Sequence, residues 1–152
     1  MNLQKLFSKL KVQLFDHDPG ATTAIVTSPD GGTTIRTVDM RGCRNFGVLA
    51  MSSTLTGNGI TKLEIIAAAL ATMASPEVIK DSGTVAADAV GDYVGLECSA
   101  EEVAQKASDT GKALRYVAAR ITCHNAADEA VVLYLQDGIK FKGNALTANS
   151  IA

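Results

Sequence analysis

The amino-acid sequence predicts a mainly β protein: an antiparallel, jelly-roll-like β-sandwich with a short N-terminal helix and one short inserted helix. Short runs rich in β-branched residues alternate apolar and polar side chains, as half-buried strands do. Turn-forming residues separate these runs at regular intervals, which is typical of all-β sandwiches and barrels. The sequence lacks the alternation of strands with long helices that would indicate a parallel sheet. A single domain with few helices is therefore expected.

The N-terminal segment carries an apolar stripe at helical spacing, formed by Leu3, Leu6, Phe7 and Leu10. A helix of two turns is marginal alone, so it should dock either on its own domain or on a neighbouring subunit. We assign residues 1–15 to an N-terminal helical arm, 16–137 to the β-sandwich and 138–152 to a C-terminal tail.

Four segments of the first half are predicted as strands. Residues 22–27 and 33–40 flank a Gly-rich turn and predict a hairpin with an outer or edge strand. Residues 45–52 are apolar on both faces, which indicates a covered, central strand. Residues 60–67 form the next strand, and 67–73 fit either a helix or a strand that ends in a turn.

The second half begins with a surface excursion over residues 76–81 and 85–89, followed by a strand at 93–98. A helix is predicted over 99–107, because Ser99 and Glu102 have the spacing of a capping box.

The longest predicted strand covers residues 114–124, and 130–135 is its expected antiparallel partner across a polar loop. Arg115 and Arg120 project from opposite faces of this strand. At least one of them should therefore either extend its charged end to solvent or pair with an acid, which could lie across a subunit boundary.

Composition excludes several function classes. The chain has 152 residues, a formal net charge of −2 and no Trp, so it lacks the basic field for direct nucleic-acid binding and offers few aromatic platforms. Its three cysteines have no C-x-x-C spacing, which predicts free, mostly buried thiols rather than disulfides or zinc. No signal peptide or membrane-spanning run is found, so we expect synthesis and folding in the cytoplasm.

No catalytic, metal or cofactor site is predicted, and the protein is not expected to be an enzyme. Asp16, His17 and Asp18 could bind a cation, but they precede Pro19-Gly20 and fit a turn better. Cys123 and His124 are adjacent on a strand and should point to opposite faces, which separates a nucleophile from its base. No hydrolase, metalloprotease or phosphate-loop motif occurs.

Three segments together resemble small structural proteins encoded in the morphogenesis clusters of tailed bacteriophages. The first, residues 38–48, begins with Val-Asp and continues through a Gly into a strand. The second is Tyr-Val-Gly at 93–95, and the third is the strand at 114–121 that contains Arg-Tyr-Val. The resemblance spans about residues 33–135. It implies a β-sandwich virion component, most simply a capsid decoration or cement protein that bridges major capsid subunits. A head-tail connector or minor tail subunit is the alternative within this class.

The expected partners are the major capsid protein or other virion subunits, with many copies in a symmetric assembly and no direct contact with nucleic acid or membrane. A host-surface or carbohydrate-binding module is the alternative from another class, since jelly rolls also serve as lectins. The lack of Trp counts against it. The candidate subunit contacts are the apolar stripe and three arginines: Leu3, Leu6, Phe7, Leu10, Arg36, Arg115 and Arg120.

Overall fold

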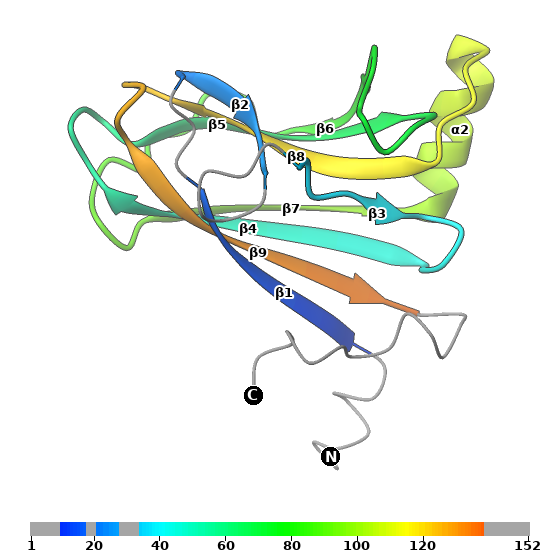
Figure 1. The fold of residues 1–152 in the computed structure, drawn as a ribbon, viewed down its shortest axis with the longest axis horizontal. Coiled ribbons are helices and arrows are strands. Elements are labelled where there is room, and N and C mark those ends of the chain that lie inside the picture. Colours follow the sequence, from blue (N-terminus) through cyan, green and yellow to red (C-terminus); the bar gives the residue numbers. More distant parts are fainter. Residues whose placement is uncertain (1–9, 18–20, 28–33, 139–152) are drawn as a thin grey trace.

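The computed structural model describes residues 10–17, 21–27 and 34–138, which form two antiparallel sheets packed face to face (Figure 1). The first sheet has the order β1-β9-β4-β7, and the second has the order β2-β8-β5-β6 with β3 also paired to β8. The predicted β-sandwich is therefore confirmed. The strands are β1 (Leu10–His17), β2 (Thr23–Ile25), β3 (Val38–Asp39), β4 (Asn45–Thr54), β5 (Ile60–Ala68), β6 (Glu77–Asp81), β7 (Tyr93–Ser99), β8 (Tyr116–Cys123) and β9 (Glu129–Asp137).

The strand order is that of a jelly roll when β2 and β3 are taken as one interrupted strand. β1 pairs with β9, β4 with β7 and β5 with β6, while β2 and β3 lie end to end along β8. These pairings make a folded antiparallel ribbon that wraps around one core, which is how two Greek keys combine in jelly-roll domains.

The core lies between the sheets and centres on Tyr134 of β9. Its ring makes edge-to-face contacts with Phe15 and Phe46, each at a centroid distance of 4.9 Å. Such aromatic pairs contribute about 0.5–1.5 kcal/mol beyond the area they bury. From the second sheet, Leu63, Ile65 and other aliphatic side chains close the opposite side.

The structure corrects the predicted N-terminal arm. Residues Leu10–Phe15 belong to strand β1 and to the sandwich, so any arm can include only the residues before Leu10. Leu10 fits the helical stripe, but it also fits the strand alternation, in which Val12 and Leu14 lie opposite Leu135 and Leu133 of β9. Pairing with a long neighbouring strand outweighs a marginal two-turn helix. Leu3, Leu6 and Phe7 lie outside the described residues.

The predicted pairing of 114–124 with 130–135 is wrong. The first segment is β8 of the second sheet, and the second is β9 of the first sheet. Both edges of β8 are already occupied, by β5 on one side and by β2 and β3 on the other. The chain therefore crosses between sheets after β8, and β9 inserts between β1 and β4.

The predicted hairpin over 22–40 is present only in part. β2 and β3 both pair with β8, and one isolated bridge between Thr27 and Ile35 joins the two arms. Its Gly-rich turn, like residues 139–152 of the predicted tail, lies outside the described part of the chain.

The segment 76–81 was predicted as a surface excursion, but Glu77–Asp81 form β6 and pair with β5. The open choice at 67–73 is settled as a strand that ends at Ala68, followed by a turn in which Met73 has a φ of 54°.

The inserted helix is confirmed as α2 (Ala100–Thr110), with a capping box between Ser99 and Glu102. It ends at Gly111, whose left-handed conformation suits a residue without a Cβ.

Candidate interaction surface

The centre of the outer face of the first sheet is apolar, with Asp16 and Glu97 at its edges. Residues at alternate positions of β1, β9, β4 and β7 point away from the core, and the strand registers align them in rows across the sheet. Antiparallel sheets with one solvated face usually alternate apolar with polar residues, and this sheet does not. Three successive rows are Asp16-Val131-Met51-Tyr93, Leu14-Leu133-Leu49-Gly95 and Val12-Leu135-Gly47-Glu97.

Part of this face is strongly exposed. The exposed fractions of Leu14, Met51 and Tyr93 are 55%, 36% and 69%. Together with the half-buried Val131 and Leu133 between them, these residues form what we call the apolar ridge. A contiguous group of exposed apolar side chains is a candidate site of association.

Next to the ridge lies a shallow hollow of about 560 Å³, which we call the glycine hollow. Gly47 of β4 and Gly95 of β7 leave its floor open. Leu49 and Leu135 supply apolar walls, and Glu97 adds a carboxylate at the rim. Val48, Leu96 and Lys80 complete the lining.

The outer face of the second sheet differs, because the chain itself covers it in part. A second buried cluster, Ile66, Ala68, Met73 and Ala118, packs with the half-buried Ile25, Ile35 and Val78. Met73 comes from the turn after β5, and Ile35 from the segment that precedes β3. The apolar cluster on the outer side of this sheet is therefore covered by loops of the same chain.

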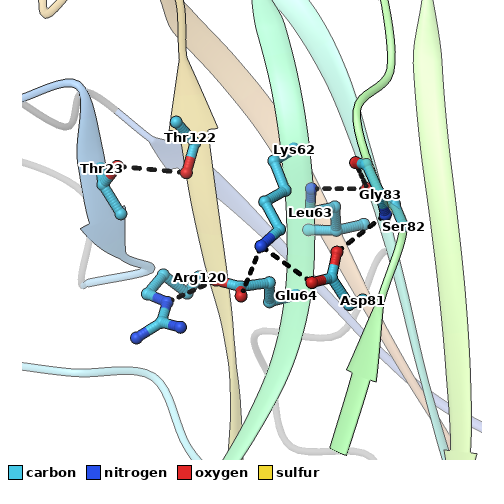
Figure 2. Close-up of polar contacts among 9 residues, drawn as sticks. All are labelled: Thr23, Lys62, Leu63, Glu64, Asp81, Ser82, Gly83, Arg120 and Thr122. Atoms are coloured by element: carbon cyan, nitrogen blue, oxygen red, sulfur yellow. Dashed lines mark hydrogen bonds and ion pairs between the residues drawn. The ribbon is translucent and has the colours of Figure 1, made fainter. Parts of the chain in front are cut away.

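The same outer face also carries a charged network (Figure 2). The Arg120 guanidinium lies 2.6 Å from Glu64, and the Lys62 ammonium lies 3.0 Å from Glu64 and 2.8 Å from Asp81. The hydrogen bond from Arg120 holds the pKa of the Glu64 carboxyl below its usual value despite burial. Hydrogen bonds to Asp81 and Glu64 raise the pKa of Lys62. This network keeps four ionised groups satisfied within one chain.

The predicted contact residues lie in different parts of the fold. Arg115 pairs with Asp39 of its own chain at 2.5 Å, and Arg120 pairs with Glu64, so the expected acid partners are intramolecular. The Arg36 guanidinium lies 5.3 Å from the centre of the Phe15 ring. Of the apolar stripe, only Leu10 is described, and it lines a smaller hollow beside Gly47. The structure does not bring the arginines together into one surface.

Sequence reasoning missed most of the ridge and the hollow. The signal was present in 130–135, where Val131, Leu133 and Leu135 alternate with equally apolar core residues. Residues 45–52 show the same pattern, which was interpreted as a strand covered on both faces. β4 does lie between two strands, but Met51 on its outer side is exposed, so the second face is not covered by described residues.

The loops at one end of the sandwich are held by Asp128. Its carboxylate accepts hydrogen bonds from the backbone N–H groups of Thr56, Gly57 and Asn125 at 2.6–3.0 Å. Burial raises the pKa of this carboxyl, but the donated hydrogen bonds outweigh burial and hold the pKa below its usual value. This is a structural clasp, because every nearby donor belongs to the loops that it joins.

Among the described residues, no group of three or more His, Cys, Asp or Glu side chains could hold a metal ion. His17 is buried on the core side of β1, whereas Asp16 points outward. Cys123 is buried and His124 exposed, so these neighbours are separated as expected. Cys43, Cys98 and Cys123 are free and buried, which confirms the prediction for the thiols. No helix in the described ranges is long and apolar enough to cross a membrane.

No protein-family model and no curated protein matches the sequence. Among solved structures, the chain is similar to infectious bursal disease virus VP2 from a subviral particle, with a TM-score of 0.41 and 13% identity over 90% of this chain. It spans only 35% of that VP2 chain. It is also similar to the PRD1 vertex protein P5, with a TM-score of 0.36 and 9% identity over 87% of this chain and 98% of that chain. Identities this low transfer no function.

Proposed function

We propose that this protein is a non-catalytic structural subunit of a virus particle that attaches to other subunits through the apolar ridge. The observation that carries the proposal is the exposure of Leu14, Met51 and Tyr93 on one sheet face, beside a second sheet whose apolar outer cluster is covered by its own loops. A monomer gains nothing from leaving such surface in water, whereas a partner subunit would bury it.

The more specific role we propose is that of a capsid decoration protein of a tailed bacteriophage, which bridges major capsid subunits. Support for this comes from the sequence resemblance to phage morphogenesis proteins, and the jelly-roll order is compatible with it. Many copies on a symmetric lattice would multiply a modest contact into durable reinforcement. In this scheme Arg115 and Arg120, each paired with an acid, and Arg36, which lies over the Phe15 ring, are intrachain stabilisers, and the ridge provides the contact.

The test is co-sedimentation of the purified full chain with expanded heads of the phage that encodes it. Stoichiometric binding is expected, and Tyr93→Lys should weaken it by about 30-fold, the effect of losing a hot-spot aromatic worth ~2 kcal/mol. Leu70→Lys is the matched control, because Leu70 is 62% exposed but lies in the turn after β5 of the other sheet.

Copy number separates the rival roles. A decoration protein would be present in hundreds of copies, whereas a connector or tail subunit would be present in about a dozen, as ring symmetry requires. Absence of the chain from purified particles by mass spectrometry would refute a virion role altogether. Equal binding by the Tyr93→Lys and Leu70→Lys variants would refute the ridge as the contact.

A further inference from the structure

Strand β7 forms one edge of the first sheet and, among the described strands, pairs with β4 alone. Two hydrogen bonds fix which of its backbone groups face β4. The N–H of Ser52 donates to the carbonyl of Asp92 at 2.9 Å, and the N–H of Ala100 donates to that of Arg44 at 2.8 Å. The register between these points has no shift. Because an antiparallel strand directs its backbone groups alternately to its two sides, the odd-numbered residues of β7 direct theirs to the open edge.

Three residues on this edge, Tyr93, Gly95 and Glu97, have backbone N–H and C=O groups without a hydrogen-bond partner in the described part of the chain. The next one, Ser99, donates its N–H to the carboxylate of Glu102 at 2.9 Å. Gly95 is exposed, and because it has no side chain, the exposed surface is that of the backbone itself. The edge is therefore accessible to a further strand.

The other edges of the two sheets have features that discourage strand pairing. β2 and β3 have only three and two residues. β6 has a register shift against β5 and carries Lys80, and β1 carries Lys11. Proteins commonly protect sheet edges with short strands, bulges, lysines and prolines. β7 has seven residues, a regular register, and neither Lys nor Pro, so it is the least protected of these edges.

The sequence of β7 is complementary to itself about Gly95. When two copies pair antiparallel around a two-fold axis at this residue, Tyr93 lies opposite Glu97 of the second copy, and Val94 lies opposite Leu96. The residues whose free backbone groups face the edge then lie opposite each other, and each such pair exchanges both of its hydrogen bonds. No like charges are opposed in this register, because each Glu97 faces a tyrosine.

The same register buries side chains on both faces of the new strand pair. Val94 and Leu96 pack against the core but are only half-buried, and contact with the second copy would cover them further. On the outer face Tyr93 is 69% exposed and can reach diagonally over Gly95 of the second copy. Aromatic side chains compensate for glycines in sheets in this way. Gly95 has no positive φ, so its own backbone does not require glycine, whereas close approach of a neighbouring Tyr93 favours it.

We propose that β7 pairs edge to edge with β7 of a second copy of this chain, antiparallel and centred on Gly95, so that the first sheets of the two copies join into one. This dimer goes beyond the proposed virion role, because the contact requires no other protein. It uses the strand edge and leaves Leu14 and Met51 on the outer face open to other subunits. The contact is short, so the dimer should dissociate on dilution.

The first test combines sedimentation velocity of the purified full chain over a concentration series with residue-level hydrogen exchange by NMR. We expect a dimer at high concentration and a monomer at low concentration. The amides of Tyr93, Gly95 and Glu97 should exchange more slowly in the dimer, whereas that of Leu96 should be protected in both states because it faces β4. A monomer at every concentration, or a dimer in which those three amides exchange as they do in the monomer, would overturn the proposal.

The second test is Gly95→Lys. Two lysines would then lie directly opposite each other at the axis, and the dissociation constant of the dimer should rise by about tenfold or more. A Cβ at this position has no neighbour closer than 3.4 Å, so the monomer should keep its fold. The matched control is Thr23→Lys, which places the same residue at an exposed position on edge strand β2 and should leave the dissociation constant unchanged.

Far-UV circular dichroism reports the fold of both variants. A folded Gly95→Lys variant that dimerises as the wild type does would overturn the proposal. If the substitution disrupts the fold, hydrogen exchange of the wild type alone decides the question. Binding to phage heads plays no part in either measurement, so failure of the dimer and failure of the proposed function are distinguishable.

Discussion

The Tyr134 hydroxyl of β9 accepts a hydrogen bond of 2.8 Å from the backbone N–H of Ala119 in β8, and so connects the two sheets through the core. The same hydroxyl donates to the carbonyl oxygen of Arg36 at 3.2 Å. Ala119 lies in β8 between the stretch that pairs with β2 and the stretch that pairs with β3. At this gap in strand pairing, the backbone N–H of Ala119 finds its acceptor in a side chain of the opposite sheet. Burial raises the pKa of the Tyr134 phenol, which therefore stays protonated and can donate.

Replacing Tyr134 by Phe should lower the free energy of unfolding by about 1–3 kcal/mol, because it leaves the buried N–H of Ala119 and the partly buried carbonyl of Arg36 without this partner. Urea unfolding followed by circular dichroism measures the loss. Tyr93→Phe, at an exposed position, should change stability by less than ~0.5 kcal/mol. Equal stability of the two variants would show that water replaces the missing hydroxyl.

Glu64→Gln should destabilise the protein by about 2 kcal/mol at neutral pH, because the substitution removes a charge-assisted hydrogen bond to Arg120 at a side chain that is only 7% exposed. The folded-state pKa of Glu64 lies below its usual value of 4.5. The contribution is therefore complete above that value and is lost as the pH falls through the lower, folded-state pKa. The free energies of unfolding of the wild type and of the variant should therefore become equal in acid.

Chemical unfolding of both proteins across a pH series measures this convergence. Glu77→Gln is the control, since Glu77 pairs with Lys112 at a more exposed site and its replacement should cost less stability than that of Glu64. A difference between wild type and Glu64→Gln that does not shrink in acid would assign the loss to packing rather than to charge.

Gly59→Ala should be far more harmful than Gly83→Ala, although both glycines have a similar positive φ, +63° and +67°. The left-handed backbone alone costs an alanine about 1–2 kcal/mol. At Gly83 nothing lies within 4 Å of the added Cβ, whereas at Gly59 the Cβ would overlap the carbonyl oxygen of Ala87. Thermal unfolding should show a loss above about 4 kcal/mol for Gly59→Ala only. Similar losses would mean that the loop moves to make room.

The buried thiols should resist alkylation in the folded protein. Burial raises the pKa of Cys98 from 9.0 to about 12 and that of Cys123 from 9.0 to about 11. At pH 8 the reactive thiolate should therefore be about a thousandfold scarcer at Cys98 and about a hundredfold scarcer at Cys123 than at an ordinary cysteine. Iodoacetamide labelling followed by mass spectrometry should be slow in buffer and fast in urea. Rapid labelling without denaturant would indicate local opening of β7 or β8.

The sequence was sufficient to predict the strands in which buried and exposed residues alternate, and the helix whose capping residue is Ser99. It was not sufficient for their pairing. The alternation in 130–135 shows which side chains face inward but not which strand supplies the hydrogen bonds, because that depends on which edges are already occupied. β6 was missed because Glu77, Lys80 and Asp81 give it little apolar pattern.

The candidate surface was harder to predict. An apolar outer face and a face buried by the chain's own loops have the same sequence pattern, as Leu133 and Ile66 illustrate. The distinction depends on where the turn after β5 folds, which has no local sequence signature. The arginines drew attention through their unusual charge, but Asp39 and Glu64, distant in sequence, already neutralise two of them.

The pairing of β1 with β9 has a consequence for how the protein is made. His17 and Ala130 are cross-strand neighbours, so β1 can complete its pairing only after β9 has been translated. Topologies of this kind fold slowly. A nascent chain that stops short of Glu129 would leave β1 and β4 with bare edges next to each other, open to intermolecular pairing. Premature termination should therefore yield insoluble fragments rather than smaller working proteins.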